Sequence, residues 1–184
     1  MTSRRWSMPD RTATAWIVAA IVVVSTLLVS TVAVIGARHA RPSPTEPERR
    51  ALLTATREAV TAVMTYDPAH ADRDRAGAQL HLTGLLAQQY RLSGPDLVIP
   101  GALQAGATLR ADVIGVGVHE FGVPTSAGTE ARLLAFVNEN VSVPAERAEG
   151  PAAGPAALSR WVRMREVDGR WLMVGLRPVG DALR

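Results

Sequence analysis

The feature that most constrains this chain is a run of 26 residues without a charged side chain, bounded by Arg11 and Arg38. As an α-helix the run would be about 39 Å long, enough to cross a hydrocarbon core of about 30 Å with some tilt. A bilayer core offers no water to the backbone, so a long apolar run is most stable there as a spanning helix. Cleaved signal peptides have an apolar stretch of only about 7–15 residues. We therefore expect an anchor that stays in the membrane.

This anchor divides the chain into four expected parts. They are a cytoplasmic tail at 1–11, the transmembrane helix at 12–37, a Pro-rich linker at 38–47 and an extracytoplasmic domain at 48–184. Arginines flank both ends of the span, so charge counting alone does not orient it. An early anchor after a short basic tail usually acts as a signal anchor. We therefore expect a single-pass protein of the plasma membrane with its amino end in the cytoplasm.

The distribution of charge narrows the classes of partner. Residues 1–41 carry a net charge of +4, whereas residues 42–184 carry −1. The basic character thus belongs to the membrane flanks, where arginine meets anionic head groups, and we expect no nucleic-acid partner. The chain has no Cys, which excludes thiolate nucleophiles, disulfides and most structural zinc sites.

Small residues recur along one side of the expected span. At 100° per residue a single stripe contains Ala15, Ala19, Thr26, Ser30, Ala33 and Ala37. Small side chains let helices approach closely in lipid, where association depends on packing. The stripe is either a docking face for a partner helix or a chance pattern, because Ala20, Ser25 and Thr31 lie outside it.

The domain reads as helices first and strands afterwards. Thr45 and Glu48 have the spacing of a capping box, and the apolar period predicts a helix from Pro47 to about Tyr66. A second helical region is expected over 70–91, weakened by glycines and therefore either one helix or two short ones. Strands are expected at 108–121, 130–143, 158–167 and 170–178, with a loop at 144–155. Alternation on the second strand predicts one apolar side, formed by Ala131, Leu133, Ala135, Val137, Val141 and Val143. This order predicts an α+β domain with helices on an antiparallel sheet.

The last two expected strands form a hairpin around Asp168-Gly169, a two-residue turn of the favoured type. Uninterrupted pairing through that turn would place Val162 beside Gly175 and Met164 beside Met173 on one face. Trp161 would lie on the opposite face. Arg160, Arg163 and Arg165 surround Trp161 in sequence, and they form either a partner-facing surface or an ordinary solvated strand face.

Several segments together resemble a known family. They are Tyr66-Asp67 at a helix end, Thr83-Gly84-Leu85 with Tyr90, and Val167-Asp168-Gly169-Arg170-Trp171-Leu172 in the hairpin. With the basic tail, the span and the Pro-containing linker, they resemble the Mce-associated membrane proteins of actinobacteria over about residues 13–179. The resemblance implies a cone-shaped domain similar to the nuclear transport factor 2 superfamily, with a curved sheet of about four strands. It also implies an accessory role beside Mce-type lipid importers of the cell envelope. The chain departs from the family pattern at 94–106 and in the long loop at 144–155.

Catalytic chemistry needs a specific set of residues on this fold. The candidates are Tyr66, Asp67, His81, Tyr90, Asp112 and His119, and each has a simpler structural role, such as packing a helix end or stopping a helix. Four scattered histidines do not offer the converging ligands of a metal site. We therefore expect no enzyme activity, no catalytic residues, no metal and no cofactor.

The expected function is that of a non-enzymatic accessory subunit that assists or stabilises a lipid import complex. Its partners would be the plasma membrane and membrane proteins of the transporter. Two alternatives stay open: a module that binds a lipid or another hydrophobe in its cavity, and a small enzyme built on that cavity. For a cavity, the expected rim residues are Tyr66, Tyr90, Trp161 and Trp171.

Overall fold

A computed structural model describes residues 43–147 and 155–180. The predicted tail, the span at 12–37 with its small-residue stripe, and the first half of the linker (38–42) lie outside these residues. Within them, no helix is both long and apolar enough to span a membrane. The described residues form one compact unit by themselves.

The first layer of this unit is helical. It contains α2 (Glu46–Met64), η1 (Pro68–His70), α3 (Ala71–Gln79), α4 (Gly84–Ser93), η2 (Gly94–Leu97) and α5 (Ala102–Ala105). The capping box begins α2 as predicted, because Glu48 Oε2 accepts hydrogen bonds from the Thr45 backbone N–H at 2.8 Å and from its hydroxyl at 2.7 Å. The second helical region is two helices, and the segment at 94–106 contains only short helical turns.

The helix α2 ends two residues before the predicted end at Tyr66. The Tyr66 backbone N–H donates to the Leu109 carbonyl at 2.9 Å, and the Leu109 N–H donates back at 2.8 Å. This pair of bonds ties the chain after α2 to the start of the sheet. The backbone groups of Tyr66 are therefore used by a strand-like bridge, which a local helical period does not reveal.

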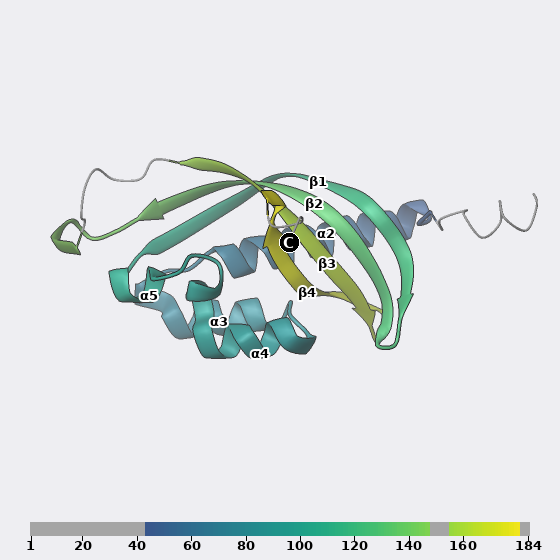
Figure 1. The fold of residues 1–184 in the computed structure, drawn as a ribbon, viewed down its shortest axis with the longest axis horizontal. Helices are drawn as coiled ribbons and strands as arrows, with labels where there is room; N and C mark the ends of the chain where they lie inside the picture. The colour runs from purple at the N-terminus through teal and green to yellow at the C-terminus, as the bar shows by residue number, and fades with distance from the viewer. Residues whose placement is uncertain (1–42, 148–154, 181–184) are drawn as a thin grey trace, which may run out of the picture. The chain divides into compact units, whose positions relative to one another are not determined.

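The second layer is a four-stranded antiparallel sheet in the order β1-β2-β3-β4. Its strands are β1 (Thr108–Thr125), β2 (Gly128–Ser142), β3 (Ala156–Val167) and β4 (Arg170–Pro178). The predicted α+β class and the four strands are confirmed. Register shifts interrupt β1 after Val113, after Val118 and after Glu120. Such bulges bend a strand, and Figure 1 shows the long β1–β2 ribbon curving over the helices.

The hairpin departs from the predicted register partway along. Asp168 (φ 51°) and Gly169 (φ 74°) form the turn, and Met164 pairs with Met173 as predicted. A bulge follows, so Val162 pairs with Leu176 and Arg163 pairs with Gly175. The extra residue is Val174, which is buried. Burial of this side chain accounts for a shift that the turn alone does not encode.

The core lies between the helices and the concave face of the sheet. It is mainly aliphatic, and its fully buried side chains include Leu52, Val60, Val63, Met64, Leu133, Val137, Val162, Met164 and Met173. On β2 the predicted alternation is confirmed from Ala131 to Val137, whereas Val143 is exposed. Glu139 also falls on this buried face, at 5% exposure.

Candidate functional site

The two faces of the sheet differ in what lies against them. Side chains of β2 at odd positions from Ala131 to Val137 pack into the core with α2. Those at even positions point the other way and form what we call the outer face: Glu130, Arg132, Leu134 and Phe136 with their cross-strand neighbours on β1, β3 and β4. In Figure 1, α3, α4 and α5 lie on the concave side, and α2 packs its buried side chains into the core there, so none of these four helices covers the outer face. The outer face is therefore a candidate surface for contact with a partner.

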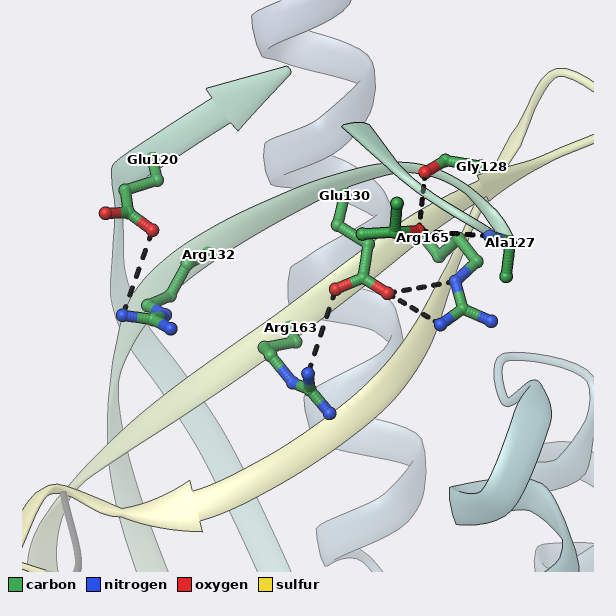
Figure 2. Close-up of polar contacts among 8 residues, drawn as sticks. Glu120, Ala127, Gly128, Glu130, Arg132, Arg163 and Arg165 are labelled. Carbon is green, nitrogen blue, oxygen red and sulfur yellow. Dashed lines mark hydrogen bonds and ion pairs between the residues drawn. The ribbon is translucent and has the colours of Figure 1, made fainter. Parts of the chain in front are cut away.

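A buried carboxylate organises one end of the outer face. Glu130 is only 8% exposed, and its Oε1 accepts hydrogen bonds from Arg165 Nε at 3.0 Å and Nη2 at 2.6 Å. Its other oxygen, Oε2, lies 3.8 Å from Arg163 Nη1. Figure 2 shows both guanidinium groups converging on this one carboxylate. Charge-assisted hydrogen bonds of this kind are short and strong, so Arg165 is held in one position.

A second ion pair lies beside the first (Figure 2). Arg132 Nη1 is 3.8 Å from Glu120 Oε2, and Arg132 pairs directly with Arg163 across β2 and β3. Arg177 on β4 pairs with Trp161 and is exposed. This part of the face therefore carries two negative and four positive side chains, an excess of two positive charges. The acids are Glu120 and Glu130, and the arginines are Arg132, Arg163, Arg165 and Arg177.

Apolar rings lie next to the arginines. The Trp161 ring is 5.2 Å from the His119 ring, centroid to centroid, with the planes tilted by 58°. Phe136 is 43% exposed and lies over Gly115, where an added Cβ would meet the ring at 3.5 Å. Half-exposed aromatic rings among arginines are characteristic of the energetically important parts of protein interfaces.

The four residues expected at a cavity rim are not brought together. Tyr66 and Tyr90 are buried on the helical side, and Trp161 belongs to the outer face. Trp171 lies on the concave side, where its ring is 5.9 Å from that of Phe121. Burial raises the pKa of Tyr90 to about 12, and its hydroxyl has no hydrogen-bond partner among the described residues.

An open groove of about 680 Å³ lies elsewhere, between α2 and α3. It is lined by residues of α2 from Arg57 to Thr65 and by residues from Arg73 to His81. Two of its charged groups are already engaged: Asp74 Oδ2 accepts the backbone N–H of Asp67 at 3.0 Å, and Arg57 Nη1 donates to the Val113 carbonyl. Gly77 leaves open space at its floor.

The other catalytic candidates lie apart from one another. Asp67 accepts the backbone N–H of Ala69 at 2.9 Å, and this bond, together with the nearby His70 ring, lowers the pKa of its carboxyl. It therefore acts as the cap of η1. His81 lines the groove, while Asp112 is exposed on the outer face. Among the described residues, no three metal-binding side chains converge.

Arg160 lies on the opposite face from Arg163 and Arg165. It pairs with Ala135, a core residue, because strand positions alternate between faces. There it lies near Glu139, whose pKa is raised by burial and partly lowered by the arginine charge. The sequence analysis considered the three arginines as one surface, but in the structure only Arg163 and Arg165 share a face of the sheet. Glu130 and Arg132, which the sequence analysis did not single out, join those two instead.

Comparisons with known proteins give relatives in Mycobacterium tuberculosis. The chain is 32% identical over 125 residues to the outer membrane protein Rv1973, covering 68% of this chain and 72% of the relative. It is 31% identical over 130 residues to the uncharacterized protein Rv1362c, covering 71% of this chain and only 55% of that relative. The chain thus spans about half the length of Rv1362c. No family model matches the chain.

Solved structures with a similar arrangement of elements share little sequence. The periplasmic domain of DotI gives a TM-score of 0.49 at 11% identity, covering 75% of this chain and 99% of that one. A periplasmic fragment of TraM gives 0.48 at 9% identity, covering 67% and 90%.

Proposed function

The chain belongs to the same family as the outer membrane protein Rv1973 of Mycobacterium tuberculosis, and from this premise we propose that it is a membrane-anchored accessory protein of the cell envelope. In this proposal it is not an enzyme, and the described domain works outside the cytoplasm. The name of the relative supports a place in the envelope. The uncharged segment at 12–37 supports attachment through a single helix.

We further propose that the protein assists or stabilises an Mce-type lipid importer. The support is the ordered set of sequence segments that resembles Mce-associated proteins, from Tyr66-Asp67 to the final hairpin. Within the membrane, the stripe from Ala15 to Ala37 would dock against a helix of the importer. A domain similar to the nuclear transport factor 2 superfamily would provide the extracytoplasmic contact.

The observation that carries the accessory role is the outer face. An accessory subunit needs a preformed surface that binds a partner, and a surface costs less entropy on binding when its side chains are already held. Glu130 holds Arg165 on this face, and Phe136 and Trp161 offer apolar area beside it.

The direct test is purification of the full-length protein in mild detergent, followed by mass spectrometry of the proteins that elute with it. Importer subunits should be recovered in a fixed ratio to the protein. Replacing Ala19, Thr26 and Ser30 by Leu should reduce that recovery by about tenfold if the stripe is the docking face, since the helices could no longer approach closely. The matched control replaces Ile17, Ile21 and Ile35 by Leu on the opposite side. A monomer without any importer subunit would refute the accessory role.

The topology has its own test. A reporter enzyme that is active only outside the cytoplasm, fused after Arg184, should be active in intact cells. A fusion that is active only in the cytosol would refute the extracytoplasmic placement.

The groove between α2 and α3 favours a second candidate function, the binding of a lipid or other hydrophobe. Its volume of about 680 Å³ falls in the range of small-molecule sites. Organic extraction of the purified protein should then release a bound lipid, and Gly77→Leu should lower its yield by filling the open floor. An unchanged yield in Gly77→Leu would place any bound lipid elsewhere.

A further inference from the structure

Two arginines of the outer face are placed side by side with donors to spare. Arg132 and Arg163 are direct cross-strand partners, so their Cβ atoms lie about 4.5–5.5 Å apart. Their side chains are 48% and 50% exposed. Each is 3.8 Å from its acidic neighbour, which is beyond hydrogen-bond distance. Both guanidinium groups can therefore donate to another acid.

The local balance of charge favours such an acid. Like charges directly opposite each other destabilise a sheet. Glu130 uses Oε1 on Arg165, so its remaining oxygen compensates Arg163 only in part. A carboxylate placed between Arg132 and Arg163 would relieve their repulsion and could accept hydrogen bonds from both.

Open space lies above the outer face at Gly117, and we call this space the notch. Gly117 on β1 pairs with Leu134, which in turn pairs with Trp161 on β3. A Cβ added at Gly117 would meet no atom within 4 Å. Leu134 therefore lies beside the notch, and the Trp161 ring, which contacts His119, lies one strand further on. Phe136 follows Leu134 by two residues on β2 and so points to the same face.

From these observations we infer that the outer face binds an acidic segment of a partner protein. One carboxylate of the segment bridges Arg132 and Arg163, and a neighbouring apolar side chain enters the notch at Gly117. The inference rests on the proposed accessory role and adds to it the chemistry of the partner.

The pattern of charges argues for a protein partner over two other occupants. An anionic membrane surface rewards positive charge alone, whereas Glu120 and Glu130 lie among the arginines and would be repelled by it. A second copy of the chain would bring the arginines of both copies together. A segment with one carboxylate placed between Arg132 and Arg163 meets both arginines and avoids the two glutamates, and such placement of single charges is how charged interfaces achieve specificity.

The test uses the full-length protein in mild detergent and two labelled peptides of twelve residues. One repeats Glu-Leu-Glu-Trp and the other repeats Gln-Leu-Gln-Trp, and binding is followed by fluorescence anisotropy. The Glu peptide should bind at least tenfold more tightly than the Gln peptide. Arg132→Gln and Arg163→Gln should each weaken the Glu peptide by about tenfold. The control Arg91→Gln, an exposed arginine of α4, should change it less than twofold.

A second pair of variants tests the notch. Gly117→Val should weaken the Glu peptide by about tenfold with no loss of thermal stability, because valine suits a strand and the space is open. Gly77→Ala, which also points into open space but lies on α3, should have no effect on binding. If an arginine variant folds poorly, Gly117→Val still tests the inference, because its melting temperature shows that it is folded.

Three results would overturn the inference. They are equal binding of the two peptides, equal effects of Arg91→Gln and Arg132→Gln, or displacement of the Glu peptide by dioctanoyl phosphatidylglycerol at equal concentration. The last would assign the face to a lipid surface. Failure of the accessory role is distinguishable, because it would remove the importer subunits from the purified protein while leaving peptide binding intact.

Discussion

Replacing Glu130 by Gln should destabilise the domain by about 2 kcal/mol. The carboxylate is 8% exposed and accepts two hydrogen bonds from Arg165. Hydrogen bonds to charged groups contribute about 1.5–3 kcal/mol, and breaking a fully buried ion pair costs about 3–5 kcal/mol. The Arg165 side chain keeps 21% exposure, so water can reach it after the change and the lower range applies. The contact with Arg163 at 3.8 Å adds little, because that side chain is half exposed.

This prediction is measured by urea unfolding and by thermal unfolding of the full-length protein in mild detergent, each followed by tryptophan fluorescence. At about 3 °C per kcal/mol for a domain of this size, the melting temperature should fall by about 6 °C. A double-mutant cycle with Arg165→Met should give a coupling free energy of about 1 kcal/mol or more.

The matched control is Glu120→Gln, since Glu120 forms a partly exposed ion pair with Arg132 at 3.8 Å, without a hydrogen bond to it. Its effect should stay within about 0.5 kcal/mol. If Glu130→Gln and Glu120→Gln had equal effects, or if the coupling were zero, the carboxylate would not hold Arg165 and the outer face would not be preorganised.

Three other changes have defined outcomes. Burial raises the pKa of Glu139 above its usual 4.5, so near that pH the folded state binds more protons than the unfolded state, and the unfolding free energy falls as pH rises through and above 4.5. In urea titrations at pH 4 and pH 7, the unfolding free energy of Glu139→Gln should fall less between the two pH values than that of the wild type. At pH 7 this variant should be more stable than the wild type. Leu133→Ala, at a fully buried position, should cost about 3 kcal/mol, measured by the urea midpoint, and a loss below about 1 kcal/mol would mean that the site collapses around the cavity. Gly128→Ala should cost about 1–3 kcal/mol, because φ is 121° and the new Cβ would lie 3.1 Å from the Glu166 carbonyl oxygen; an unchanged melting temperature would show that the turn relaxes freely.

Local patterns in the sequence predicted most of the elements. The capping box at Thr45 began α2, and the alternation on β2 identified its buried face from Ala131 to Val137. The Asp168-Gly169 turn set the pairing of the hairpin as far as Met164 and Met173. Each of these signals acts between residues that are close in the chain, so each can be read without knowledge of the rest of the fold.

The site could not be predicted in the same way. Its central pair, Arg132 and Arg163, is joined by no tight turn, because the connection from β2 to β3 runs from Val143 to Pro155. The register between those strands is set by burial of Leu133, Val162 and their neighbours in the core. The bulge at Val174 likewise comes from packing.

The sequence by itself therefore determined the kinds of element, their order, and the buried side of β2 from Ala131 to Val137. It also set out the uncharged segment at 12–37, whose length alone favours a membrane anchor. The tertiary structure decided which charged side chains meet on the outer face, that Arg160 is separated from Arg163 and Arg165, and that Tyr66 ends α2 by bridging to Leu109. These outcomes depend on registers and contacts between distant segments, and those are selected by the packing of the whole core rather than by any local pattern.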